Sequence, residues 1–436
     1  MNIHHMEKRL RLFAAAWERK GLHMAFSPFD FVKTLSFVRY GGTPEERRAA
    51  GLIRDAVESA GGSCEFMEFQ IPASICKHCV VETVAPVSHR IDAVAFGMCA
   101  GIPAPGKTFQ LYYAERGTER DYLGRDDLSD TVVMLNTLSL DAYKQLCARH
   151  AGAILVIAGK YYQSAAEAGI YARNLRPKFL EYGNIPTFSV SAHDATELIR
   201  SGVGAIHIEL EHSYGEASSQ NVLATVGGTQ PMQESIVLTA HYDSVPLGAG
   251  AWDNATGSAA LLGLYFYFLA HPVRRTLRFI WCGAEEQGLL GSKAYAAQHE
   301  AELANIKFCF NFDMCGTILG NNQIFITGGK ELETFVDQYC RETGYSASTR
   351  TGVHSSDSAP FADHGIPSLG LSRGTSTSEI HTCRDQLFPI GEQALLQNIR
   401  DFTGLVSRVA DSAVLPVDTG MPEEMKKELD KYFQRD

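Results

Sequence analysis

The stretch that decides the fold runs from residue 235 to residue 291 and reads SIVLTAHYDSVPLGAGAWDNATGSAALLGLYFYFLAHPVRRTLRFIWCGAEEQGLLG. Apolar, β-branched runs at 235–240 and 276–282 are typical of buried strands. Between them, the apolar block at 259–270 is too short to span a bilayer and predicts a buried helix. A strand, a helix and a second strand in this order predict one unit of a parallel sheet.

Side chains of the kinds that bind metal ions follow both predicted strands. His241 ends the first run and Asp243 comes two residues later, whereas Glu285 and Glu286 follow the second run. A glycine-rich loop between the runs delivers Asp253 directly before the helix. Strand ends that carry histidine, aspartate and glutamate predict a metal site at one edge of the sheet.

The alternation of strands and helices continues along the chain. Further strand-like runs occupy 221–226, 308–312 and 367–371, so we expect a mostly parallel, mixed α/β sheet flanked by helices. Ligands of such sheets bind beyond the carboxyl ends of the strands. Asp313 directly follows one of these runs, and His381 lies beyond the last of them. Both residues are therefore candidates for the same edge.

The middle of the chain has a different pattern, with short β runs alternating with short helices and no cluster of histidine and carboxylate residues. The change in strand length and spacing favours a smaller, β-rich inserted domain over a continuation of the main sheet. We also expect a helix followed by a loop within residues 1–28. The predicted parts are the first piece of the main domain at 1–90, the insert at 91–215, the main domain at 216–415 and a helical tail at 416–436.

The composition of the 436-residue chain is that of an ordinary soluble protein, with 45% hydrophobic and 20% charged residues. This length is sufficient for two or three domains. The net charge of −11 argues against a nucleic-acid partner, because phosphate binding requires a basic surface. No signal-like segment opens the chain and no run is long enough to cross a bilayer, so we expect a cytoplasmic protein without a membrane partner.

The ten cysteines leave two questions open. In a long chain without a secretory signal we expect reduced thiols rather than a disulfide framework. Cys76 and Cys79 form a lone CxxC pair, which half a zinc knuckle or a redox pair would also contain. Cys315 and Cys383 each lie two residues after a candidate ligand, and the pattern assigns them no role.

The candidate ligands predict two metal ions rather than one. Imidazoles and carboxylates without thiolates suit zinc, with cobalt or manganese as substitutes. Two histidines and three carboxylates are too many for one tetrahedral zinc with an open position, but they fit two ions if one carboxylate bridges. Asp253, a short side chain in a tight loop, is the bridging candidate. His241 and Asp313 would complete one ion, and Glu286 and His381 the other.

Glu285 and Asp243 receive catalytic roles in this interpretation. Adjacent residues at a strand end project in different directions, so Glu285 can face the activated water as general base while Glu286 binds metal. Asp243 projects to the same side as His241 and can accept its second N–H. Taken singly, these motifs are more often a buried histidine with a turn aspartate, or a solvated helix start. Their combination at successive strand ends favours a catalytic site.

At these positions the chain resembles the zinc metallopeptidases of the bacterial leucyl aminopeptidase and glutamate carboxypeptidase type. The resemblance covers residues 30–410 and implies a two-zinc exopeptidase with the same five ligands and the same base. It also implies that the insert is a protease-associated domain, on its placement and strand pattern. The chain departs from the family in Cys383, where proline is common, and in Asn254, where many members have a second acid. The matching motifs are HYDS at 241–244, WDNATG at 252–257, GAEEQGLLGS at 283–292, NFDM at 311–314, SDSAPF at 356–361, GIP at 365–367 and IHT at 380–382.

The sequence therefore predicts a zinc-dependent exopeptidase with a peptide substrate. The favoured type is an aminopeptidase, which releases N-terminal residues. A carboxypeptidase or a dipeptidase on the same scaffold is the alternative. A non-catalytic receptor or scaffold is disfavoured by the intact ligand set, and a one-zinc glutaminyl cyclase would not need both His241 and Asp313. Asp357 and His354 are candidates for the substrate pocket or for support of the ligands. The pattern assigns no oligomeric state.

Overall fold

The computed structural model describes residues 26–435 with the exception of 86–87, 162, 164–169, 171–172, 232 and 375–379. Most of the helix expected within residues 1–28 therefore lies outside the described residues. Within the part of the chain that is described, no helix is both long enough and apolar enough to cross a bilayer. All ten cysteines belong to this part and are free thiols, as expected.

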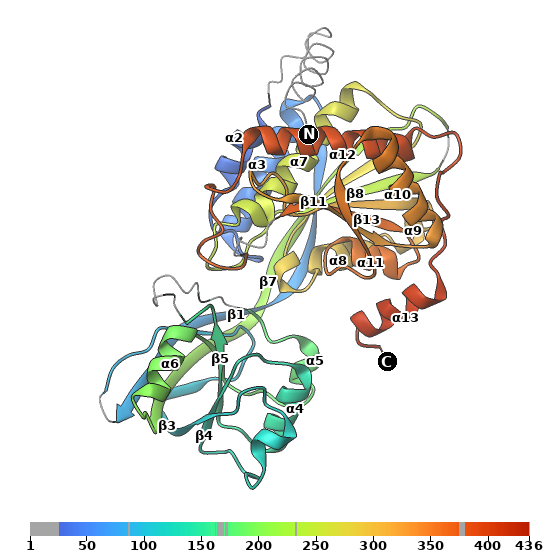
Figure 1. Cartoon of the computed structure of the whole chain (residues 1–436). Helices are drawn as coiled ribbons and strands as arrows, with labels where there is room; N and C mark the ends of the chain where they lie inside the picture. The colour runs from blue at the N-terminus through green and yellow to red at the C-terminus, as the bar shows by residue number, and fades with distance from the viewer. Residues whose placement is uncertain are drawn as a thin grey trace.

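The chain alternates between strands and helices from its first described residues onward (Figure 1). The strands are β1 (Cys64–Ala85), β2 (Ala93–Ala95), β3 (Ile102–Tyr113), β4 (Thr131–Leu135), β5 (Ala153–Ala158), β6 (Thr187–Ser191), β7 (Ala205–Val226), β8 (Ser235–His241), β9 (Thr276–Cys282), β10 (Ile306–Phe312), β11 (Asn321–Thr327), β12 (Ala347–Thr351) and β13 (Ser368–Gly374). The helices are α2 (Pro28–Leu35), α3 (Pro44–Ser59), α4 (Leu140–Ala148), α5 (Pro177–Leu180), α6 (Ala192–Arg200), α7 (Thr256–Ala270), α8 (Leu290–Gln298), α9 (Glu300–Leu303), α10 (Lys330–Thr343), α11 (Ser358–Asp363), α12 (Glu392–Ala410) and α13 (Glu423–Tyr432), with short helical turns at Glu119–Tyr122, Ala251–Ala255 and Glu285–Gln287.

The central part of the sheet is parallel. β13, β10, β8 and β9 lie side by side in that order with parallel pairing, whereas β7 on one side and β11 on the other pair antiparallel with their neighbours. Helices lie on both faces of this sheet (Figure 1). The expectation of a mixed α/β sheet flanked by helices is confirmed.

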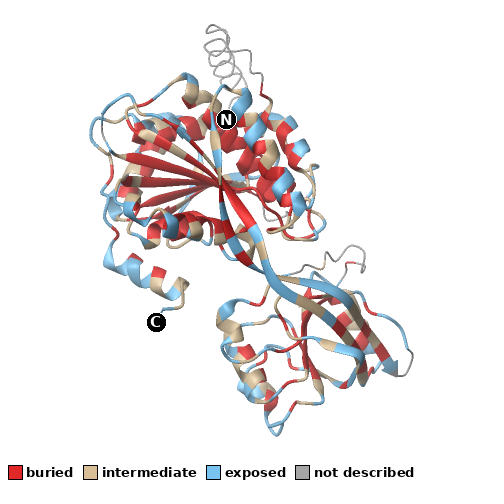
Figure 2. Cartoon of the chain, turned by 180° about the vertical axis from the view of Figure 1, so that it is seen from behind, coloured by how far each residue is buried: buried red, intermediate tan, exposed pale blue. Residues whose placement is uncertain are grey.

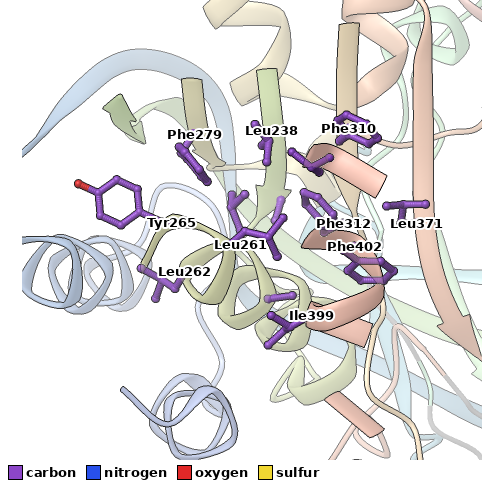
Figure 3. Close-up of a cluster of buried hydrophobic side chains, with 14 of the residues drawn as sticks. Leu238, Leu261, Leu262, Tyr265, Phe279, Phe310, Phe312, Leu371, Ile399 and Phe402 are labelled. Atoms are coloured by element: carbon purple, nitrogen blue, oxygen red, sulfur yellow. The ribbon is translucent and has the colours of Figure 1, made fainter. Parts of the chain in front are cut away.

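The core explains why the block after Asp253 forms a helix that is apolar on all sides. α7 packs against the sheet on one side and against α2 and α12 on the other, so it has little contact with water. Figure 3 shows Leu238 and Phe312 of the sheet meeting Leu261 of α7, with Phe402 of α12 beside them. The rings of Phe312 and Phe402 lie 5.3 Å apart. This packing fixes α7, and with it the loop at the start of the helix.

Two long strands connect the main part of the molecule to a second part. β1 and β7, each of 22 residues, pair antiparallel along their length and leave the buried sheet as a twisted ribbon (Figure 1, Figure 2). Beyond the ribbon, buried side chains between Val81 and Leu210 form a hydrophobic cluster of their own. The chain thus has a second core in the region where the insert was expected. The boundaries of 91 and 215 and the protease-associated type stay predictions.

Candidate metal centre

The carboxyl ends of three neighbouring parallel strands form the edge at which the candidate residues meet. β8 ends at His241, which is in register with Cys282 at the end of β9. Directly beyond β9, a short helical turn carries Glu285 and Glu286. β10 lies on the other side of β8 and is followed by Asp313. The sheet thus gathers these side chains where parallel topology predicts a ligand site.

Asp253 reaches the same edge from the short helical turn Ala251–Ala255, and His381 reaches it from a loop. Asp253 Oδ1 lies 3.1 Å from His241 Nε2, and Asp253 Oδ2 lies 3.1 Å from His381 Nε2. Asp313 Oδ1 is 3.5 Å from His241 Nε2. Glu286 Oε2 is 3.1 Å from His381 Nε2. The five side chains form two groups that share Asp253, and the ligand atoms of each group lie within 4.8 Å of one another.

The electrostatics of the two groups favour bound cations. Burial and the charge of Asp253 raise the pKa of Glu286 to about 7. Burial alone lowers the pKa of His381, but its hydrogen bonds with Asp253 and Glu286 outweigh that effect and raise it to about 11. One buried carboxylate oxygen of Glu286 and one of Asp313 have no hydrogen-bond partner among the described residues. A cation in each group would satisfy the carboxylate oxygen that belongs to that group, and a donor set without thiolates fits zinc.

Asp243 contacts more of the site than the sequence predicts. Its Oδ1 lies 3.5 Å from Nδ1 of His241, on the side where we expected it to fix the imidazole. Its two oxygens also accept the backbone N–H groups of Glu285 at 3.0 Å and of Glu286 at 3.2 Å. One carboxylate therefore positions a candidate ligand and the turn that carries the candidate base.

Asp385 and Arg39 support the same centre but were missed by sequence reasoning. Asp385 accepts the backbone N–H of Trp252 at 2.7 Å and that of Asp253 at 2.9 Å, one with each oxygen. Arg39 is fully buried and donates to the carbonyl groups of Leu35, Phe37, Tyr242, Ala249 and Gly250. Burial lowers the pKa of Arg39 to about 10, against the opposing effect of nearby carboxylates. The place of Asp385 four residues after His381 is a signal that could have found it, whereas Arg39 has none in the sequence.

Glu46 is a third residue that the sequence did not reveal. It is buried on α3 and accepts hydrogen bonds from Gly42 N at 2.6 Å, Ser219 Oγ at 2.7 Å and Ala284 N at 3.1 Å. Burial raises the pKa of Glu46 to about 8. Ala284 has a φ of 51°, a left-handed conformation that is unfavourable outside glycine. The bond from Ala284 to Glu46 helps to hold this residue directly before the two glutamates.

The serine-rich segment after β12 supports Asp313. Ser356 Oγ donates to Asp313 Oδ2 at 2.7 Å and accepts from Asn311 Nδ2 at 2.5 Å. Asp357 is buried and accepts from Ser292 Oγ at 2.6 Å. His354 instead stacks on the ring of Phe325 with centroids 3.8 Å apart. Roles of Asp357 and His354 in the substrate pocket stay predictions.

The second part of the molecule reaches the turn that carries Glu285. Asn174, beyond β5, donates to Gln287 Oε1 at 3.5 Å. Gln287 in turn donates to the carbonyl of Gly41 at 2.9 Å. The predicted insert therefore faces the candidate centre rather than the far side of the sheet.

Comparisons with known proteins agree with this geometry. Residues 221–403 match the profile described as Peptidase family M28, and this segment contains all five candidate ligands. The chain is 27% identical over 372 residues to "Aminopeptidase YwaD" of Bacillus subtilis, with 82% of this chain and 78% of the relative covered. It is also 27% identical over 248 residues to "Leucine aminopeptidase 2" of Trichophyton equinum, of which it covers 49%.

Solved structures share the fold. A zinc aminopeptidase from Bacillus subtilis superimposes with a TM-score of 0.74 at 24% identity, over 92% of this chain and 98% of that protein. An aminopeptidase from Aneurinibacillus sp. strain AM-1 superimposes with a TM-score of 0.70 at 23% identity, over 90% of this chain and 95% of that protein. At these sequence identities the similarity shows a shared fold only, and the superposition covers both parts of the molecule.

Proposed function

We propose that the chain is a zinc-dependent aminopeptidase that releases residues from the N-terminus of peptides. The match to peptidase family M28 and the aminopeptidase relatives indicate a hydrolase that acts on peptide bonds. The observation that carries the proposal is the carboxylate of Asp253. Each of its oxygens lies 3.1 Å from a different histidine at the carboxyl edge of the sheet. A carboxylate shared in this way is what a site with two neighbouring ions requires.

Two zinc ions per chain follow from this arrangement as part of the proposal. Asp253 would bridge them, His241 and Asp313 would hold one ion, and Glu286 and His381 would hold the other. When bound, zinc would polarise the carbonyl group of the substrate and lower the pKa of a water molecule. Cobalt or manganese would substitute, because the donors are imidazoles and carboxylates.

Glu285 is the proposed general base. Burial raises the pKa of Glu285 well above its usual range, which is the direction that strengthens a general base. Its Oε2 lies 4.0 Å from His241 Nε2, beside the ligands but outside both groups. Glu285 takes a proton from the attacking water at Oε2 and delivers it to the nitrogen of the leaving amine. Asp243 keeps this carboxylate in position through the backbone N–H of Glu285.

A panel of peptides tests the direction of cleavage. Hydrolysis that requires a free N-terminus and tolerates a blocked C-terminus supports an aminopeptidase. Hydrolysis that requires a free C-terminus would instead establish a carboxypeptidase, and a requirement for both ends a dipeptidase. Metal analysis of the purified chain gives the stoichiometry, for which we expect two zinc ions.

The second part of the molecule belongs to the same proposal. We assign residues 91–215 to an inserted domain of the protease-associated type. The binding partner that we propose for the whole chain is its peptide substrate. Its own hydrophobic cluster and the contact of Asn174 with Gln287 support this assignment.

A further inference from the structure

A cavity of about 360 Å³ lies between the two parts of the molecule, outside the ligand groups. Val81, Ile91 and Val94 line it from the second part, and Leu247 and Cys383 line it from the main part. Its size is that of a small ligand site, and of the ten described residues that line it all but Arg90 and Asp92 have apolar or thiol side chains. The charged side chains that contribute, Arg90 and Asp92, are both exposed. The cavity therefore suits an apolar group rather than an ion.

The two loops on the main side of this cavity are the loops of the candidate metal centre. Leu247 lies between His241 and Asp253, and Cys383 follows His381 by two residues. Two residues of extended chain span at most about 7 Å, so the cavity begins close to the second ligand group. The loops also touch each other, because a Cβ at Gly248 would lie only 2.7 Å from the carbonyl oxygen of Thr382.

The inner end of the Leu247 loop is held firmly. Ser244 Oγ donates to the carbonyl of Gly248 at 3.2 Å, and Arg39 Nη1 donates to that of Ala249 at 2.6 Å. Leu247 itself projects from this loop with 36% of its surface exposed. A fixed loop that presents an exposed leucine to a cavity is a suitable wall for an apolar ligand group.

We propose that this cavity binds the side chain of the residue directly after the scissile bond, and that it selects peptides with an apolar residue there. The inference rests on the proposed function. An aminopeptidase holds one residue on the amine side of the bond but a chain of any length on the leaving side. The leaving side must therefore face open space, and the cavity between the two parts of the molecule, beside the His381 loop, meets that requirement.

The test compares two series of dipeptides with the full-length, zinc-loaded protein. In the first series the N-terminal residue is leucine and the second residue is glycine, alanine, leucine or phenylalanine. We expect kcat/KM for Leu-Leu to exceed that for Leu-Gly by about tenfold, since an apolar pocket discriminates by this order. The second series varies the N-terminal residue before leucine. Leu247→Trp fills the cavity. We expect it to lower the ratio of kcat/KM for Leu-Leu to kcat/KM for Leu-Gly about tenfold, without changing the order of kcat/KM values within the second series.

Ile199→Trp is the matched control, because Ile199 is an exposed apolar residue of the second part on α6, outside the cavity. Its Leu-Leu to Leu-Gly ratio should equal that of the parent protein. Alkylation with N-ethylmaleimide gives a second measurement. It should lower the ratio of kcat/KM values of the parent protein but not that of the double variant Cys79→Ser, Cys383→Ser, because both thiols line the cavity. An unchanged ratio in Leu247→Trp and after alkylation, or a change confined to the second series, would overturn the inference. Failure to cleave any dipeptide would instead overturn the proposed function, and this inference with it.

Discussion

Asp385→Asn tests how the fold holds the residue that both ligand groups share. The residue Asp385 is 5% exposed, and each of its carboxylate oxygens accepts one backbone N–H, from Trp252 at 2.7 Å and from Asp253 at 2.9 Å. Asparagine keeps one carbonyl oxygen and turns an amide NH₂ toward the other N–H. One of the two bonds is therefore lost and a buried donor is left without an acceptor.

The size of the effect follows from these contacts. A hydrogen bond to a charged acceptor contributes about 1.5–3 kcal/mol, and an unsatisfied buried donor costs about 1–3 kcal/mol. Because Asp253 is the residue displaced, we expect zinc affinity to fall about 10–100-fold, as for other residues that orient a metal ligand. This decrease corresponds to about 1.4–2.7 kcal/mol of binding free energy.

The assay is the zinc dissociation constant, measured by competition with a chromophoric chelator, which does not require turnover. Asp411→Asn is the matched control, because exposed Asp411 accepts the backbone N–H of Arg274 at 3.1 Å on another part of the surface. Its zinc affinity should equal that of the parent protein. If Asp385→Asn also bound zinc with unchanged affinity, the carboxylate would not be what positions Asp253, and the reasoning would be refuted.

Three further predictions concern the base, the metal and pH. Glu285→Gln should bind zinc normally and lose about 10²–10⁴-fold in kcat, because it removes proton transfer alone; near-normal kcat would place the base elsewhere. Zinc at 100 times its dissociation constant should stabilise the parent protein by about 2.7 kcal/mol for each occupied site in thermal denaturation, and Asp253→Asn should lose most of this gain. The pKa of Glu46 is raised to about 8 by burial, so its contribution to stability is complete below about pH 4.5 and is lost as pH rises through 8. The thermal midpoint of the parent protein, measured relative to that of Glu46→Gln, should therefore decrease as the pH is raised from 5 to 8. A constant difference would contradict the raised pKa of Glu46.

Local pattern in the sequence was sufficient to locate the strands and the residues at their ends. Apolar runs ending at His241, before Glu285 and before Asp313 predicted where parallel strands stop, and the structure places those ends side by side. This works because a buried parallel strand needs a continuous apolar run, and its polar end marks the edge of the core. The chemistry of the ligands is likewise a property of residue type.

What only the tertiary structure decided is which distant groups hold these residues in place. Arg39 meets the carbonyl of Gly250 across 211 positions, Asp385 meets Asp253 across 132, and Glu46 meets Ala284 across 238. A buried polar residue shows no periodicity, and these partners lie far away along the chain, so its role appears only when the fold brings a donor or an acceptor to it. The cavity at Leu247 has the same origin, because its two walls belong to parts of the chain that the sheet, not the sequence order, brings together.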